Sequence, residues 1–296
     1  MSPTSTNGGS SWTRPLAFWD AWGGCFDATF NGASNAWVLL GQANGFNGIA
    51  RTTNGGVSWS VAEGAAAGLP PRYTWKNRAP VAIVAPSAAV VLATIHGALQ
   101  RSIDGGATWT VVDSSTLYGD LLLDKANPSI VYAYSRLGIH RSANAGATWE
   151  LMAGSPKLPP GDFDGTNESR LALAANSDLY ATRYTARATG GTDGGLWHLR
   201  AGVWTQIWGS AQAQFAFDVA LDPTNANRIA IVTNDNPWHD RMGSSGVWLS
   251  TNGGTSFSQQ NTNLPMNRGG TIAFDPVTSG KLIVGLNGRG FWTARF

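Results

Sequence analysis

The chain has 296 residues and a formal net charge of +2, and charged side chains make up only 13% of it. Lys and Arg are spread along the sequence without a basic cluster, so neither nucleic acid nor an anionic membrane is an expected partner. No apolar run approaches the ~18 residues that a membrane span needs. With 37 glycines and 14 tryptophans, a chain of this length fits one large all-β domain with many tight turns.

The single Cys25 excludes an internal disulfide and a thiolate metal site, and we expect it to be a small buried apolar residue. Met1 leads directly into SPTSTNGG rather than into a signal peptide, which suggests a mature chain or an excised domain. Low charge and high Trp and Gly content favour a secreted or extracellular protein. The four histidines show no metal-ligand spacing, and no cofactor or metal ion is expected.

An eight-residue motif recurs along the chain: Ser or Thr, any residue, Asp or Asn, any residue, Gly, any residue, Ser or Thr, and an aromatic residue. Its copies span 5–12, 52–59, 102–109, 142–149 and 250–257. The Asp or Asn can bond the backbone that follows it, and Gly supplies a positive φ, which predicts a tight hairpin turn. The motif resembles the Asp-box (BNR repeat) of sialidases and other glycan-active propellers. There it lies between the third and fourth strands of a blade, on the face away from the ligand.

Short apolar runs between the motifs repeat one order of strands. In the clearest unit, DVALDPTN (218–225) ends at an Asp-Pro turn, RIAIVTN (228–234) follows, and GVWLS (246–250) leads into the motif. In GLWHLRAGVWTQI (195–207), Trp204 takes the place of the motif aromatic without the motif. The aromatic positions lie roughly 40–50 residues apart, the length of a four-stranded blade.

These units predict an all-β fold, a six-bladed β-propeller of four-stranded antiparallel blades, formed by one domain over residues 1–296. The last stretch, KLIVGLNGRGFWTARF, lacks a motif, and the first stretch, STNGGSSWTRP, lacks preceding strands. We therefore expect the two ends of the chain to share one blade and to close the propeller without an open sheet edge.

Strand order also predicts where a ligand binds. Loops that follow each motif and loops between second and third strands lie on the face opposite the motifs, where binding residues are expected. A glycosidase needs one carboxyl as acid and a second as base or nucleophile. The candidate catalytic residues in these loops are Asp20, Asp164, Glu168, Asp235 and Asp240. Asp104 belongs to a motif, and Asp124, Asp222 and Asp275 close first-strand turns, so these four are predicted to be structural.

Aromatic and cationic residues of the same loops are candidate substrate contacts, because indole rings stack on sugar faces. They are Trp19, Trp22, Arg72, Trp75, Arg78, His96, Arg183, Tyr184, Trp238, His239 and Arg241. The alternative for each Trp is that it fills the core between blades. His140 and His198 fall in predicted strands and are expected to be structural.

Three stretches resemble glycoside hydrolase family 74, the xyloglucan-active endoglucanases and reducing-end cellobiohydrolases: 48–109, 178–207 and 217–254. The resemblance covers roughly residues 45–260 and implies hydrolysis of a β-glucan. Members of the family have two propellers facing each other across a cleft, with one catalytic Asp from each. Their base lies in Arg-Thr-Asp-x-Gly-Gly-Ala-Tyr-Arg-Trp. The nearest match here, STNGGSSW, has Asn7 in place of that Asp, and Asn cannot accept a proton as a base does.

Four functions remain open on the sequence. The first is a glycoside hydrolase acting on a β-glucan or xyloglucan-type polysaccharide, and the second is a non-catalytic glycan-binding propeller. A sialidase could draw on Arg72, Arg183, Arg241, Arg268, Tyr184 and Glu168, but the Arg-Ile-Pro signature of that family is missing near the N-terminus. The fourth is a protein-docking propeller. The expected partner is a polysaccharide or oligosaccharide, bound by a monomer or by one domain of a larger protein.

Overall fold

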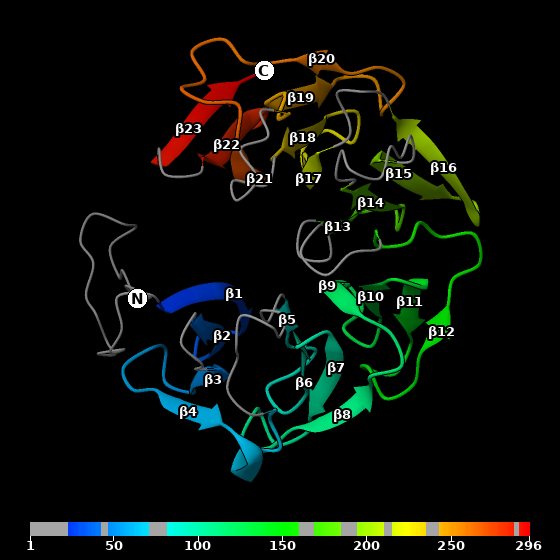
Figure 1. Ribbon diagram of the computed structural model, residues 1–296. Coiled ribbons are helices and arrows are strands. Elements are labelled where there is room, and N and C mark those ends of the chain that lie inside the picture. Colours follow the sequence, from blue (N-terminus) through cyan, green and yellow to red (C-terminus); the bar gives the residue numbers. More distant parts are fainter. Residues whose placement is uncertain are drawn as a thin grey trace. The chain divides into compact units, whose positions relative to one another are not determined.

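The structure is a computed structural model that describes residues 23–42, 47–70, 82–159, 169–184, 194–209, 215–234, 243–286 and 290–296. Within these ranges the chain forms six antiparallel sheets of three or four strands (Figure 1), and the one helical element is a 3-10 turn at Ala65–Ala67. No helix of the described part is long and apolar enough to cross a membrane. The chain divides into two compact units, Met1–Ala133 with His140–Leu151, and Tyr134–Ile139 with Met152–Phe296.

The first unit contains three four-stranded sheets. Their strands are β1 (Gly23–Asn31), β2 (Asn35–Gln42), β3 (Asn47–Thr52) and β4 (Ser60–Glu63); β5 (Ile83–Val84), β6 (Val91–Ile95), β7 (Ala98–Ser102) and β8 (Thr110–Asp113); and β9 (Tyr118–Leu123), β10 (Val131–Ser135), β11 (Gly138–Ser142) and β12 (Glu150–Leu151). The tip of the third sheet, Tyr134–Ile139, groups with the second unit.

The second unit contains two four-stranded sheets and one described with three strands. Their strands are β13 (Leu171–Leu173), β14 (Leu179–Arg183), β15 (Gly195–Arg200) and β16 (Val203–Trp208); β17 (Ala216–Leu221), β18 (Ile229–Thr233), β19 (Val247–Ser250) and β20 (Ser258–Gln259); and β21 (Gly269–Phe274), β22 (Lys281–Leu286) and β23 (Gly290–Arg295). All six sheets follow the strand order expected from the apolar runs.

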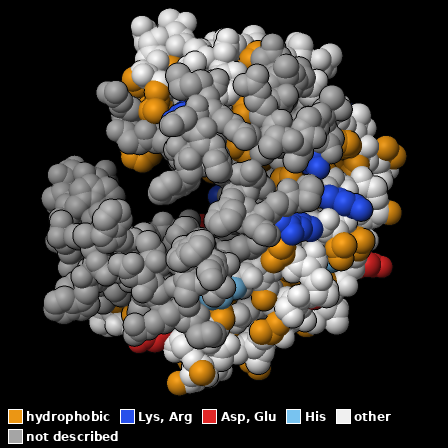
Figure 2. Space-filling model, viewed as in Figure 1, with side chains coloured by type: hydrophobic (Ala, Val, Ile, Leu, Met, Phe, Trp, Pro, Cys, Tyr) orange, Lys and Arg blue, Asp and Glu red, His pale blue; other side chains and the backbone are white. Residues whose placement is uncertain are grey.

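The core lies between neighbouring sheets of each unit. Strands β6, β10 and β18 are buried along their whole length, which explains why their sequences are continuous apolar runs rather than alternating ones. In the first unit, Trp37 of β2 packs with Ile83 and Val91 of the second sheet. Burial of each such side chain stabilises the fold by about 1.5–3 kcal/mol. Among the coloured residues of Figure 2, exposed apolar side chains are scattered between other uncharged side chains and a few Lys and Arg side chains.

The motif copy at 102–109 shows how the eight residues form a turn. The hydroxyl of Ser102 accepts a hydrogen bond from Gly106 N (2.7 Å) and donates to Asp104 Oδ1 (2.8 Å). Asp104 Oδ1 accepts from Thr108 N (2.9 Å), and Thr108 Oγ1 donates to Asp104 Oδ2 (2.6 Å). Trp109 Nε1 donates to Gly106 O (3.1 Å), which fixes the ring under the turn. The Asp104 carboxylate therefore accepts hydrogen bonds from within the motif and has a structural role, as the sequence predicts.

Each of the four described copies connects the third and fourth strands of its sheet, and each reaches the turn between the first and second strands. The backbone N of the fourth motif residue donates to a carbonyl of that turn: Gly55 to Ser34 (2.9 Å), Gly105 to Ala89 (2.7 Å), Ala145 to Ser129 (2.8 Å) and Gly253 to Asn227 (3.0 Å). Motif and first turn therefore share one end of the sheet, here called the motif end. The connection between second and third strands lies at the other end, here called the loop end.

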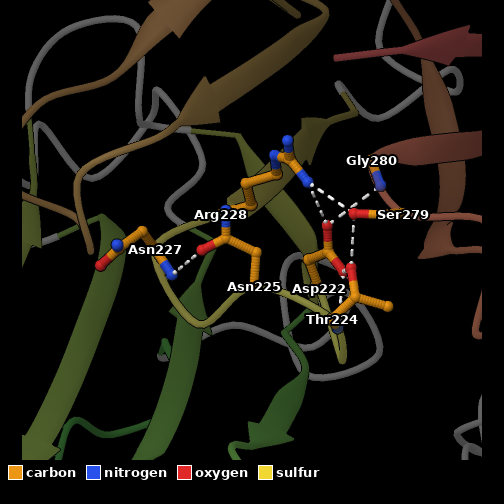
Figure 3. A network of polar contacts seen from close by, with 7 residues as sticks. All are labelled: Asp222, Thr224, Asn225, Asn227, Arg228, Ser279 and Gly280. Atoms are coloured by element: carbon orange, nitrogen blue, oxygen red, sulfur yellow. Dashed lines mark hydrogen bonds and ion pairs between the residues drawn. The ribbon is translucent and has the colours of Figure 1, made fainter.

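A polar network ties the fifth and sixth sheets together at the motif end (Figure 3). Asp222 closes the β17–β18 turn by accepting from Thr224 N (2.8 Å) and Thr224 Oγ1 (2.7 Å), and its Oδ2 lies 3.1 Å from Arg228 Nη1. Arg228 also donates to Ser279 Oγ (3.1 Å), and Gly280 N donates to Asp222 Oδ2 (3.3 Å). Burial alone would raise the pKa of Asp222, but these donors hold it below its ordinary value. The network makes Asp222 structural, as expected.

The predicted closure involves residues 1–22, which lie outside the described residues together with the first motif copy. In the described part of the sixth sheet, β23 pairs with β22 on one side only. The shared blade therefore stays a prediction.

Candidate functional site

Three of the predicted site residues lie in the described part of the chain: His96, Arg183 and Tyr184. All five catalytic candidates and the other substrate contacts lie outside it: Asp20, Asp164, Glu168, Asp235, Asp240, Trp19, Trp22, Arg72, Trp75, Arg78, Trp238, His239 and Arg241. Their roles stay predictions.

His96 lies at the loop end of the first unit, in the two-residue turn between β6 and β7. Its φ of 54° and the φ of 77° at Gly97 fit the type I′ turn that joins twisted strands. Positive φ is uncommon for a residue with a side chain and is found often at functional positions. Burial lowers the pKa of His96, so its imidazole is neutral at pH 7 and can donate one hydrogen bond and accept another.

Arg183 and Tyr184 end the second strand of the fourth sheet, at the loop end of the second unit. Arg183 is 9% exposed, and its Nε donates to Lys157 O (2.7 Å). Tyr184 is 1% exposed and packs edge-on against Phe215, with ring centroids 5.6 Å apart. Its backbone N donates to Ser169 Oγ (3.1 Å). The fold thus holds both side chains rigidly; contact with a glycan stays a prediction.

The loop end of the second unit also holds a carboxyl group that sequence reasoning missed. Asp218 lies three residues into β17, next to a β-bulge that shifts the register between Ala216 and Asp218. Its Oδ1 accepts from Val219 N (2.8 Å), and its Oδ2 accepts from Ile272 N (3.0 Å) and Thr271 Oγ1 (3.2 Å). Bulges redirect side chains and occur often beside active sites. Here the bulge brings the carboxyl against the first strand of the next sheet.

The fourth sheet fixes the other side of the same bulge. Thr182 Oγ1 donates to Phe217 O (2.9 Å) and accepts from Arg170 N (2.7 Å). The guanidinium carbon of Arg170 lies 5.4 Å from the centroid of the Phe217 ring, within the range of a cation–π contact. We call Arg170, Thr182, Phe217, Asp218 and Thr271 the β17 site.

Burial and charge act in opposite directions on Asp218. Burial raises its pKa, while the positive charge of Arg170 and the donors Ile272 N, Val219 N and Thr271 Oγ1 lower it. Burial prevails, and the pKa lies above the ordinary value of an aspartate. A carboxyl that keeps its proton to higher pH is suited to donate it to a leaving group.

Asp27 of the first sheet makes a similar set of contacts. It follows a register shift between Cys25 and Asp27, its Oδ1 accepts from Ala28 N (2.8 Å), and its Oδ2 accepts from Ile83 N (2.9 Å) of the next sheet. A carboxylate at this place therefore joins the first strands of two sheets. The donors to Asp218 include Thr271 Oγ1, and the positive charge of Arg170 lowers the pKa of Asp218.

One sequence signal could have revealed Asp218. It is the charged residue inside the apolar strand FAFDVALD, four positions before the turn aspartate Asp222. An acidic residue in such a strand is costly to bury unless it is bonded or functional. Asp218 lies inside a strand, whereas the carboxyl groups predicted to be catalytic lie in loops.

The described residues contain no group of three or more His, Cys, Asp or Glu side chains that could hold a metal ion. The β17 site has one carboxyl, one guanidinium, two hydroxyl groups and one aromatic ring, and the carboxyl is its group suited to donate a proton.

In the described residues, these features define an all-β protein of antiparallel three- and four-stranded sheets, four of which carry the turn motif at one end. Known proteins share this fold. No family profile matches the sequence. A xyloglucanase from Paenibacillus sp is 25% identical over 249 residues, which are 82% of this chain and 22% of that protein.

Two solved glycoside hydrolase family 74 structures are similar in fold. The enzyme from Niastella koreensis aligns with a TM-score of 0.67 and 20% identity over 91% of this chain and 45% of its own. The xyloglucanase from Xanthomonas campestris aligns with a TM-score of 0.66 and 17% identity over 92% of this chain and 45% of its own. The chain therefore spans less than half the length of these relatives.

Proposed function

We propose that this chain is a carbohydrate-active propeller, part or all of a glycoside hydrolase that cleaves a β-glucan or xyloglucan-type polysaccharide outside the cell, with Asp218 as its general acid. The observation that carries the proposal is a carboxyl at the loop end that is held at a bulge and bonded to Ile272 N and Thr271 Oγ1 of the next sheet, and burial raises the pKa of this carboxyl. The similarity to xyloglucanases supports the choice of substrate.

The β17 site suits both states of a general acid. Before reaction, burial favours the protonated carboxyl, which can give its proton to the glycosidic oxygen as the bond to the leaving sugar breaks. After the transfer, Ile272 N and Thr271 Oγ1 donate to the carboxylate, and the positive charge of Arg170 acts on it. The anion formed is stabilised without rearrangement.

Hydrolysis needs a second carboxyl to activate water or to attack the sugar. We propose that it comes from the loop candidates Asp20, Asp164, Glu168, Asp235 and Asp240. We also propose that the six sheets are blades of one propeller, that the motif is an Asp-box, and that residues 1–22 complete the sixth blade beside β23.

The test compares Asp218→Asn with Asp27→Asn, because both substitutions remove a carboxylate that joins two first strands. Each variant is assayed for new reducing ends on a polysaccharide panel that includes xyloglucan, and its unfolding free energy is measured in urea. We expect similar losses of stability, a fall of about 10²–10⁴ in kcat for Asp218→Asn, and at most a few-fold change for Asp27→Asn. Equal activity losses in the two variants would show that Asp218 acts only as a structural clamp.

A non-catalytic glycan-binding module is the second candidate, and the contacts shared by Asp27 and Asp218 favour it. A carboxylate that only joins sheets needs no chemistry. Affinity electrophoresis in gels that contain the same polysaccharides separates the two functions. Retarded migration without any product supports the binding module and overturns the hydrolase.

A further inference from the structure

Arg170 is anchored at several points next to Asp218. Its backbone N donates to Thr182 Oγ1 (2.7 Å), its Nη1 donates to Ser169 O (3.2 Å), and its guanidinium lies over the Phe217 ring at 5.4 Å. A guanidinium held by a hydrogen bond and an aromatic face loses less freedom when it meets an anion than a mobile side chain does.

The anchor of Arg170 and the position of Asp218 are coupled through the backbone. Thr182 Oγ1 bonds both Arg170 N and Phe217 O, and Phe217 directly precedes Asp218 in the bulge. The backbone at residue 170 is thereby linked to the strand segment that carries the carboxyl, and the Arg170 guanidinium adds a side-chain contact to the Phe217 ring of that segment.

We propose that Arg170 is the positioning residue of the β17 site: its guanidinium packs on the ring of Phe217, which precedes Asp218 in the bulge, and so places a positive charge beside the carboxyl that acts as the acid. This inference rests on the proposed hydrolysis, in which Asp218 acts as the acid. Arg170 touches no reacting atom in this scheme and acts through Asp218.

The proton balance shows what the charge does. The O–H bond of Asp218 breaks as its proton joins the glycosidic oxygen, and the C–O bond to the departing sugar breaks with its electron pair on that oxygen. The oxygen of a water molecule then forms a bond to the anomeric carbon, and the second carboxylate takes the proton that this water loses, so one carboxyl gains the proton that the other gave up. Asp218 ends as an anion, so a cation beside it makes Asp218 a stronger acid, while burial keeps it protonated at rest.

Other charged or titratable groups lie on the elements packed against β17. They are Tyr180 and Arg183 on β14 and Arg268 directly before β21; β18 and the strand residues of β13 and β21 carry none. Arg183 Nε donates a hydrogen bond to Lys157 O. The positive charge of Arg170, in contrast, acts on the Asp218 carboxyl. Arg170 is therefore the residue to test.

The experiment titrates the Asp218 carboxyl by ¹³C NMR in the full chain, with the signal assigned by its loss in Asp218→Asn. Arg170→Gln removes the charge, and Arg170→Lys retains it. Arg200→Gln is the matched control, because Arg200 carries the same charge in the same unit but is 75% exposed and lies 3.8 Å from Asp178. The pH profiles of kcat/KM are measured for the same proteins.

We expect Arg170→Gln to raise the pKa of Asp218 by about one unit or more and to move the alkaline limb of kcat/KM upward by the same amount. Its kcat falls several-fold with little change in KM, because the neutralised site holds a weaker acid. Arg170→Lys retains most of the wild-type titration, and Arg200→Gln leaves it unchanged.

An unchanged Asp218 titration in Arg170→Gln overturns the inference, as does a shift of the same size in Arg170→Lys or Arg200→Gln. The carboxyl titration needs no substrate. If no variant and no wild-type protein hydrolyses any glycan, the proposed hydrolase fails, and the NMR result still decides what Arg170 does to Asp218.

Discussion

The fifth residue of the motif should tolerate only glycine, because there the motif packs against the preceding sheet. Gly146 has a φ of +78°, and a Cβ built on it would lie 2.4 Å from Cδ2 and 2.8 Å from Cδ1 of Leu92. Leu92 is fully buried in β6, so its side chain cannot move without disturbing the core. Gly146→Ala therefore combines backbone strain with overpacking.

Gly32 supplies the matched control within the same unit. Its φ is +71°, and nothing lies within 4 Å of a Cβ built on it. We expect Gly32→Ala to cost about 1–2 kcal/mol of unfolding free energy, the strain of a left-handed Ala. Gly146→Ala should cost about 1–3 kcal/mol more, the usual price of an extra methyl in a packed core. Urea unfolding followed by tryptophan fluorescence measures both.

A double-mutant cycle isolates the steric contact. Leu92→Ala alone should cost about 2–5 kcal/mol, because it leaves a cavity. In Gly146→Ala/Leu92→Ala the new methyl enters that cavity, so the double variant should be more stable than the sum of the single effects by at least ~1 kcal/mol. Additive effects, or equal costs for Gly146→Ala and Gly32→Ala, would refute the packing argument.

Two further predictions concern pH. Hydrogen bonds from Thr108 above all hold the pKa of Asp104 at about 2, against 3.8 for an ordinary aspartate, so its contribution to stability is present above pH 3.8 and is lost as the pH falls toward 2. Asp104→Asn, which supplies the residue found in the other motif copies, should change stability at pH 7 by less than about 0.5 kcal/mol and weaken the dependence between pH 4 and 2 in urea unfolding. Burial lowers the pKa of His140 despite the opposing charge of Asp113, so its contribution is present above pH ~6.5 and falls below it. His140→Phe should flatten the pH 5–7 part of the same stability curve, and an unchanged slope would contradict the assignment.

The strands and turns could be predicted from the sequence because each rests on local chemistry. Continuous apolar runs such as 229–233 became buried strands, and Asp222 closed its turn as its Asp-Pro step indicated. In each described copy of the motif, the hydroxyl of the first residue, Ser or Thr, accepts a hydrogen bond from the backbone N of the glycine at the fifth position. In such segments the residue types alone favour one local structure.

The β17 site could not be predicted in the same way. Nothing local links Arg170 to Asp218, which are far apart in the sequence and meet only because β13, β14 and β17 pack together. The raised pKa of Asp218 is also a consequence of burial between sheets. The local sequence does not indicate the raised pKa of Asp218, because that pKa depends on tertiary packing.

The first strands of alternate sheets each carry an aspartate near a hydrogen-bonded backbone carbonyl. Such a structural position can become a functional site. Asp27, Asp120 and Asp218 lie on β1, β9 and β17, and the carbonyl before Asp120 accepts from Thr94 Oγ1 (2.8 Å), as the carbonyl before Asp218 accepts from Thr182. The architecture thus supplies a bonded aspartate at equivalent places, whatever the function. Chemistry at one of them requires only suitable surroundings, and at Asp218 these include the positive charge of Arg170. If Asp218 is only a clamp, Arg170→Gln should leave the pH profile of kcat/KM unchanged and alter only stability and the Asp218 titration; if Asp218 is the acid, the same change should also move the alkaline limb of that profile.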